Sequence, residues 1–210
     1  YFEAVNRNKE SVAIDMTSEA GLEQARALAA HADVVIHNFP IRTAKKFGLD
    51  YESVVKANPT VVYCQITGFG SGKGAQMPEY DLLVQAMGGL MSVTGPAPGE
   101  PTKVGVALVD VITGMHATIG ILAALNHRHE TGEGQFVEVN LLSSLLSALV
   151  NQASSFVSGG KVPGILGNAH PSITPYEVYQ TADRPLIIAV GNDNQFVKLC
   201  EVLDIPEVAA

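Results

Sequence analysis

The sequence has few charged residues, and negative charge prevails among them. Only 16% of its 210 residues are charged, and the formal net charge is -8. This acidic balance argues against nucleic acid as the main partner, although a local basic cluster can still hold a phosphate. The hydrophobic share of 47% is enough for a large core. Together with so little charge, it predicts that a partner or further chain covers much of the surface.

Cysteine and targeting signals are also scarce. The two cysteines, Cys64 and Cys200, lie far apart in apolar surroundings, which predicts two reduced, buried thiols. The start YFEAVNRNKE has no apolar core of a signal peptide, and polar residues or glycines interrupt every long apolar run. We therefore expect no membrane partner and a cytoplasmic location, or the mitochondrial matrix in a eukaryote. Because the chain begins without Met and stops without a terminal element, we also expect a piece of a longer protein.

Three common kinds of site have no signature here. The six histidines show no metal-ligand spacing, so we expect no metal. A G-x-S-x-G elbow is missing, which argues against a serine hydrolase of that type. The stretch TGFGSGKG (67–74) differs from G-x-x-x-x-G-K-[ST], because Gly74 follows Lys73 and the first glycine is misplaced. It does not predict a nucleoside triphosphate site.

Hydrophobic periodicity predicts an α/β protein. The apolar runs 11–15 and 33–39 flank an amphipathic helix over 19–32, and strand, helix and strand in this order predict a βαβ unit with a parallel sheet. The further predicted elements are a helix around 42–56, a strand over 60–70, a helix over 79–95, a long and mostly buried helix over 107–128, a strand over 136–140, an apolar helix over 141–160, two strands within 176–190, and a helix from 191 capped by Asn192 or Asp193.

One acid stands out in the long apolar helix. Asp110 lies in its first turn, where the helix dipole favours negative charge, so a solvated capping acid is the ordinary interpretation. Apolar neighbours on both sides and the Pro/Gly loop 95–105 before the helix weaken that interpretation. A carboxylate held there, ionised at neutral pH, can attack an activated carbonyl directly. His116 is six residues further on and is expected on another face of the helix.

Polar side chains follow the predicted strands. Asn38 and Phe39 end the strand over 33–39, and ligands of open α/β sheets collect at the carboxyl ends of strands. Lys45 and Lys46 follow a few residues later. Arg7 and Lys9 precede the apolar run 11–15 and are placed to reach phosphates, although each of these cations also suits an ordinary solvated surface.

Seven blocks occur in one order along nearly the whole chain. They are NRNK-x-SVAIDM, DVVIHNF, VVYCQITGFG, YDLLVQAMGGLMSVTG, GVALVDVITGMHATIGILAAL, TGEGQFVEVNLL and GNAHPSITPYEVY. In this order they resemble the family III CoA-transferases, the group of formyl-CoA and carnitine CoA-transferases. The resemblance implies a longer chain and an interlocked homodimer. It also implies a Rossmann-like large domain over 1–158, a linker over 159–175 and the start of a small α/β domain over 176–210.

The resemblance gives Asp110 the role of the nucleophile. It would attack an acyl-CoA thioester to form a mixed anhydride, and the released CoA would then form an aspartyl-CoA thioester. Coenzyme A thioesters are thus substrates, and no permanently bound cofactor is implied. The resemblance places CoA contacts at Asn6, Arg7, Asn8, Lys9, Asn38, Phe39, Lys46, Tyr80 and Asp81, with Arg42 as a further cation.

Some positions depart from the family pattern. Glu10 stands where a basic residue is common, Pro40-Ile41-Arg42 replaces the usual turn, and Lys46 often is Arg in the family. Arg42 is therefore expected to supply its charge from a shifted position, and Lys46 to act as a point charge rather than a fork.

Two alternatives to a transferase stay open. Related racemases of 2-methylacyl-CoA carry an acid/base His where this chain has Tyr80, and tyrosine is a poor base at neutral pH. A non-catalytic CoA-binding protein is the other alternative, and the presence of Asp110 disfavours it. Within the transferases, the blocks around 89–110 and 168–179 resemble the branch that moves CoA between short dicarboxylates such as succinate and glutarate.

Overall fold

The computed structural model describes residues 2–209, which cluster into two compact units. Unit 1 comprises residues 2–84 and Ala107–Ala148, and unit 2 comprises Gln85–Val106 and residues 149–209. The domain organisation expected from the sequence, with boundaries at 158 and 175, stays a prediction.

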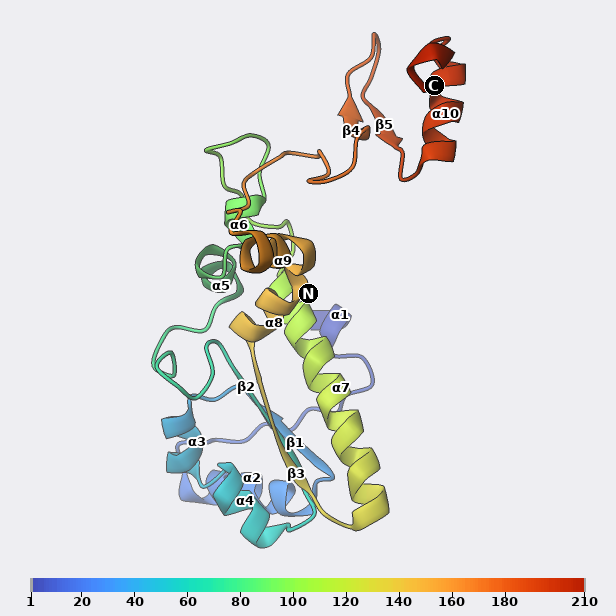
Figure 1. Cartoon of the computed structure of the whole chain (residues 1–210). Coiled ribbons are helices and arrows are strands. Elements are labelled where there is room, and N and C mark those ends of the chain that lie inside the picture. The colour runs from blue at the N-terminus through green and yellow to red at the C-terminus, as the bar shows by residue number, and fades with distance from the viewer. Residues whose placement is uncertain (1, 210) are drawn as a thin grey trace. The chain divides into compact units, whose positions relative to one another are not determined.

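Unit 1 is built on a parallel sheet with the strand order β1-β2-β3 (Figure 1). In its register, Val34 of β1 lies opposite Val62 of β2, and Cys64 of β2 lies opposite Val137 of β3. The predicted α/β class with a parallel sheet is confirmed. The elements of unit 1 are α1 (Phe2–Val5), α2 (Glu19–His31), β1 (Val34–His37), α3 (Ile41–Phe47), α4 (Tyr51–Ala57), β2 (Val62–Thr67), α7 (Leu108–Thr131), β3 (Gln135–Asn140) and α8 (Leu141–Ala148), and α5 (Asp81–Met87) begins in it.

Helices cover both faces of this sheet. On one face, Val61 and Tyr63 pack with Ala29 of α2 and Val54 of α4 in the main buried cluster. On the other face, α7 packs on β2 and β3 (Figure 1). Gly120 permits a close approach there, because a Cβ at this position would lie 2.8 Å from Cγ1 of Val137. The central strand β2 is therefore buried on both faces, as strands of parallel sheets usually are.

The cysteines agree with the sequence-based prediction. Cys64 in β2 and Cys200 in α10 (Asp193–Val202) are both free and buried. Burial raises the pKa of the Cys64 thiol, which keeps it protonated and unreactive.

Four expected elements differ from those observed. The expected helix over 79–95 divides into α5 and α6 (Leu90–Val93) at Gly89, which has φ of 91°. Residues 11–15 form no strand, because β1 pairs only with β2 among the described strands and Val12 is largely exposed. The expected helix over 42–56 divides into α3 and α4 at Gly48, which has φ of 67°. The expected helix over 141–160 divides into α8 and α9 (Val150–Gly159), where Val150 has φ of 33°. Apolar periodicity alone does not reveal such breaks.

Unit 2 contains a two-stranded antiparallel sheet, β4 (Tyr176–Tyr179) with β5 (Leu186–Ala189), where the sequence predicts two strands. Asn192 caps α10, since its side chain accepts the N–H of Gln195. The remaining elements of this unit are α6 (Leu90–Val93), α9 and the 3-10 helix η1 (Pro206–Ala209).

The long helix α7 is apolar enough for a second interpretation. By length and composition its 24 residues can cross a membrane, with a mean hydropathy of 1.8 over 18 residues, although Asp110, Gly114 and His116 interrupt the apolar run as expected from the sequence. Core helices of other proteins can be equally long and apolar, and one face of α7 packs on the sheet. The buried residues of α7 are Val109, Thr113, Ala117 and Ala124, which are a minority of the helix, so the prediction of a mostly buried helix is wrong.

Candidate active site

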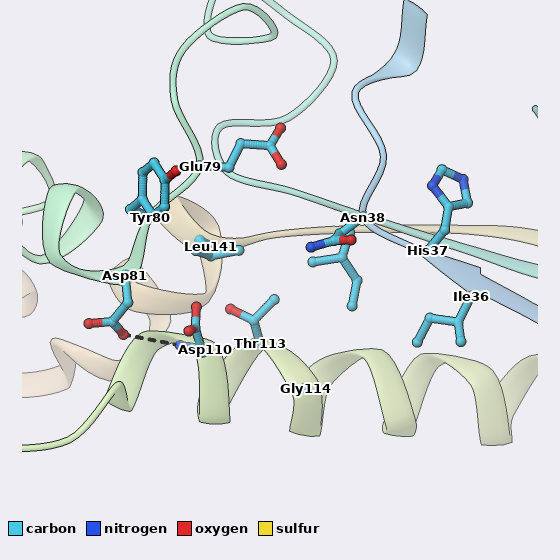
Figure 2. A pocket seen from close by; sticks show the side chains of 11 residues that line it. Ile36, His37, Asn38, Glu79, Tyr80, Asp81, Asp110, Thr113, Gly114 and Leu141 are labelled. Atoms are coloured by element: carbon cyan, nitrogen blue, oxygen red, sulfur yellow. Dashed lines mark hydrogen bonds between the residues drawn. The ribbon is translucent and has the colours of Figure 1, made fainter. Parts of the chain in front are cut away.

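A cavity of about 430 Å³ lies at the carboxyl ends of β1 and β2. This edge of a parallel sheet is where ligands bind in open α/β folds. The cavity also receives the first turns of α7 and the start of α8. Its lining residues are Ile36, His37, Asn38, Ile66, Glu79, Tyr80, Asp81, Asp110, Thr113, Gly114 and Leu141 (Figure 2).

Asp110 reaches this cavity from the first turn of α7. Oδ2 of Asp81 accepts the backbone N–H of Val109 at 2.8 Å and that of Asp110 at 3.3 Å, the second of which is drawn in Figure 2. Asp81 thus acts as a cap for α7 from another element, satisfying two N–H groups that have no partner within the helix. This contact fixes the backbone that carries the Asp110 carboxyl.

The surroundings raise the pKa of Asp110 above its ordinary value of 3.8. Partial burial disfavours the charged form, and the negative charge of Asp81 adds to the effect. The residue as a whole is exposed, so solvent screens both effects. A carboxylate with a raised pKa is a better base and nucleophile than an ordinary one. A carboxylate placed in this way can attack an activated carbonyl of a molecule in the cavity.

The pair Asn38 and Phe39 divides between cavity and core. The Asn38 side chain lines the cavity (Figure 2). The ring of Phe39 instead packs in the core cluster and lies at a centroid distance of 5.8 Å from that of Phe47. Only Asn38 of this pair is placed for a side-chain contact with a bound molecule.

The predicted phosphate-binding cations lie outside the cavity lining. Arg42 and Lys46 are one turn apart on α3, both exposed, and among the described residues neither forms an ion pair or side-chain hydrogen bond. In the turn after α1, the Lys9 ammonium donates to the Val5 carbonyl at 2.7 Å, and Asn8 has φ of 58°. The contacts of Asn6, Arg7, Asn8 and Lys9 with CoA stay predictions.

Tyr80 stands at the cavity rim and is 71% exposed. Sequence reasoning missed several of its neighbours. Thr113 and Gly114 lie three and four residues after Asp110, so helical periodicity was a sufficient signal for them. Glu79 directly precedes Tyr80. His37 contacts Phe39 two residues further on and Tyr63 from β2, and the contact with Tyr63 has no local signal in the sequence.

The glycine-rich stretch 67–74 is held by a carboxylate. Oε1 of Glu138 accepts the N–H of Ser71 at 3.0 Å, and the Ser71 hydroxyl lies 3.3 Å from Oε2. Backbone N–H groups of a phosphate loop need to stay open to the anion. Within residues 2–209 no group of three or more His, Cys, Asp or Glu side chains is arranged to hold a metal ion.

Comparison with known proteins gives consistent matches. The family model described as CoA-transferase family III matches residues 1–210. A succinate–glutarate CoA-transferase of Agrobacterium fabrum is 47% identical over all of this chain and 52% of its own length. A succinyl-CoA:glutarate CoA-transferase of Mus musculus is 40% identical over 99% of this chain and 48% of its own length.

A solved structure agrees with these relatives. The crystal structure of a CAIB/BAIF family protein from Brucella suis matches with a TM-score of 0.84 and 46% identity, covering 97% of this chain and 54% of that one. The chain thus spans about half the length of the relatives it matches. The match over all 210 residues establishes that the chain belongs to CoA-transferase family III.

Proposed function

We propose that the protein transfers CoA from succinyl-CoA to a second short dicarboxylic acid, with Asp110 as the nucleophile. One observation carries the proposal: the Asp110 carboxyl opens into the cavity at the carboxyl edge of the sheet, with its backbone tied to Asp81. The names of the bacterial and mouse relatives, which pair succinate or succinyl-CoA with glutarate, supply the acids.

The proposed reaction proceeds through four acyl exchanges. A carboxylate oxygen of Asp110 attacks the thioester carbon of succinyl-CoA, the C–S bond breaks, and CoA thiolate leaves a mixed anhydride behind. The thiolate attacks the Asp110 carbonyl carbon, which releases succinate and gives an aspartyl-CoA thioester. The acceptor carboxylate displaces CoA to form a second anhydride. Attack of CoA on the acceptor carbonyl then gives the new acyl-CoA and restores the Asp110 carboxylate.

The chemistry explains why the nucleophile is a carboxylate in a cavity. Its acyl derivatives are as reactive as a thioester, so each exchange stays reversible. An anhydride is hydrolysed by water, and an enclosed site protects it. We propose that no cofactor is bound permanently and that Asn6, Arg7, Asn8, Lys9, Arg42 and Lys46 serve the CoA nucleotide.

The proposal also includes an interlocked homodimer. On α7 the side chains of Val111, Met115, Ile119 and Leu122 are 55–63% exposed and share one face. An exposed apolar stripe of this length indicates an interaction surface, and we propose that a second copy of the chain packs on it. Light scattering of the full-length protein tests this, since Ile119→Lys is expected to give monomers. A monomeric unchanged protein would contradict it. No membrane partner, no nucleic acid and a cytoplasmic or matrix location complete the proposal.

The activity itself is tested by product analysis. Full-length protein is mixed with succinyl-CoA and glutarate, and the thioesters are separated and weighed by mass spectrometry. Glutaryl-CoA and free succinate are expected in equal amounts, with total thioester conserved. Loss of thioester without glutaryl-CoA would instead indicate a hydrolase, and intact succinyl-CoA with each of several acceptors would contradict the proposal.

A further inference from the structure

We propose that His37 is a positioning residue for coenzyme A: its neutral ring fixes the turn that carries Asn38 into the cavity, and protonation of the ring releases that turn. The inference rests on the proposed function for the identity of the ligand. His37 is the last residue of β1 and lines the cavity, yet its ring is turned away from Asp110 (Figure 2).

Both nitrogens of the ring have partners. Nδ1 lies 3.0 Å from the backbone nitrogen of Phe39, and Nε2 lies 2.6 Å from the hydroxyl oxygen of Tyr63. The Tyr63 hydroxyl donates its own proton to the Leu49 carbonyl at 2.5 Å. Tyr63 is 1% exposed, so water does not compete for these bonds.

These contacts define the protonation state of the ring. Because the Tyr63 proton points to Leu49, the Tyr63 oxygen accepts from His37, and Nε2 carries the hydrogen. Nδ1 faces an N–H donor and must be the bare acceptor. The ring is therefore neutral with a fixed tautomer, and neither nitrogen is open for acid/base work on a bound acyl-CoA.

The bond from the Phe39 N–H to Nδ1 spans residues i and i+2 and closes a tight turn around Asn38. Stacking supports the same turn, since the rings of His37 and Phe39 lie 5.4 Å apart at 27°. With Phe39 held toward the core, the Asn38 side chain is left on the cavity side. The ring thus positions a predicted CoA contact without touching CoA itself.

Protonation at Nδ1 would set two donors against each other and break this turn. Burial lowers the pKa of His37 below its ordinary value of 6.5. The turn is therefore fully formed above pH 6.5 and is lost as pH falls through the lowered value. The titratable groups that contact the ring or line the same cavity are Tyr63, Glu79, Tyr80, Asp81 and Asp110. The charges of Asp50 and Glu52 act on Tyr63.

Two substitutions separate the contact of residue 37 with the Phe39 N–H from its contact with Tyr63. In His37→Asn, the side-chain oxygen lies near the place of Nδ1 and accepts the Phe39 N–H in an Asx turn. In His37→Gln, the longer amide reaches Tyr63 but leaves the Phe39 N–H without its acceptor. The measurement is calorimetric titration of CoA into full-length protein from pH 8 to pH 5, with circular dichroism as the folding control.

At pH 8 we expect His37→Asn to bind CoA within about twofold of the unchanged protein, and His37→Gln to bind about fivefold to tenfold more weakly. Toward pH 5 the unchanged protein weakens relative to His37→Asn, which has no titrating ring. Dividing the CoA affinity of the unchanged protein by that of His37→Asn cancels the effect of protonating CoA's own phosphates, which is the same in both titrations. A ratio that stays constant with pH, or equal binding by both variants, would overturn the inference.

The outcomes distinguish the two proposals. If the unchanged protein does not bind CoA, the proposed function fails together with the inference. If it binds CoA and the variants behave alike, only the role of His37 fails. Should His37→Gln not fold, Tyr63→Phe replaces it: the ring loses its Nε2 partner and can turn, so CoA affinity is expected to fall about threefold. Unchanged affinity in that variant would also overturn the inference.

Discussion

The two edges of the parallel sheet are built differently. At the amino edge, the Arg128 guanidinium of α7 donates to the Asp33 carbonyl at 3.2 Å and the Thr60 carbonyl at 3.3 Å, and it pairs with the Asp33 carboxylate at 3.0 Å. At the carboxyl edge, the other end of α7 presents Asp110 to an open cavity beside a second acid, Asp81. One edge pairs a cation with a carboxylate and two carbonyls, whereas the other places the Asp110 carboxyl beside a like charge and in contact with a cavity.

Because α7 reaches both edges of the sheet, we expect substitutions at its two ends to affect different properties. Changes near Arg128 should lower the free energy of unfolding and leave the chemistry intact. Changes near Asp110 should lower activity and leave the fold intact, as is common where a site holds unfavourable charge contacts. We expect the following effects in the full-length protein.

The largest effect is expected for Asp110→Asn. Without a nucleophilic carboxylate, kcat for CoA transfer should fall by roughly a thousandfold or more. Urea unfolding should show equal or higher stability at neutral pH, because the raised pKa of Asp110 means that folding disfavours its charged form. That gain should vanish below pH 3.8, where both forms are uncharged. Retained transfer would remove Asp110 from the mechanism.

The next effect is expected at the other edge. Arg128→Met keeps the apolar stem but removes three hydrogen bonds that lie at the surface, which should lower the free energy of unfolding by about 1 kcal/mol. Arg184→Met is the matched control, because Arg184 pairs with Asp183 at 3.6 Å with both side chains largely exposed. Its effect should stay within about 0.5 kcal/mol. Equal losses in both variants would refute a structural role for Arg128.

The smallest effect concerns the pH profile. Asp110 acts as a carboxylate, so activity is present above its raised pKa and is lost as pH falls through it. Asp81→Asn removes one cause of that shift while its amide oxygen still accepts the Val109 N–H. The acid limb of kcat/KM should move to lower pH, and kcat should fall about tenfold as the charged cap weakens. Glu79→Gln, at another acid of the cavity, should leave the limb in place.

The sequence alone was sufficient to predict the elements that have strong local signals. Helix α7, strands β2 and β3 and the position of Asp110 follow from apolar runs with polar interruptions. The strand expected at 11–15 failed because pairing needs a neighbouring strand, which a local pattern does not report. The breaks at Gly48 and Val150 depend on single backbone angles.

Long-range polar contacts were beyond local reasoning. The bond between His37 and Tyr63 joins residues 26 apart, and that between Arg128 and Asp33 joins residues 95 apart. The cap that Asp81 forms on α7 is of the same kind, 28 residues before Val109. The family resemblance placed Asp81 among the site residues. The structure adds that its Oδ2 accepts the N–H groups of Val109 and Asp110.

The most direct test of the central claim is mass spectrometry of the full-length protein after mixing with succinyl-CoA, with and without hydroxylamine. The account predicts a CoA-sized adduct on the Asp110 peptide, which hydroxylamine converts to a hydroxamate. Asp110→Asn should give neither product. An unmodified Asp110 peptide under conditions where CoA is transferred would contradict the account. Exchange of the proton at C2 of a 2-methylacyl-CoA without any adduct would favour a racemase instead.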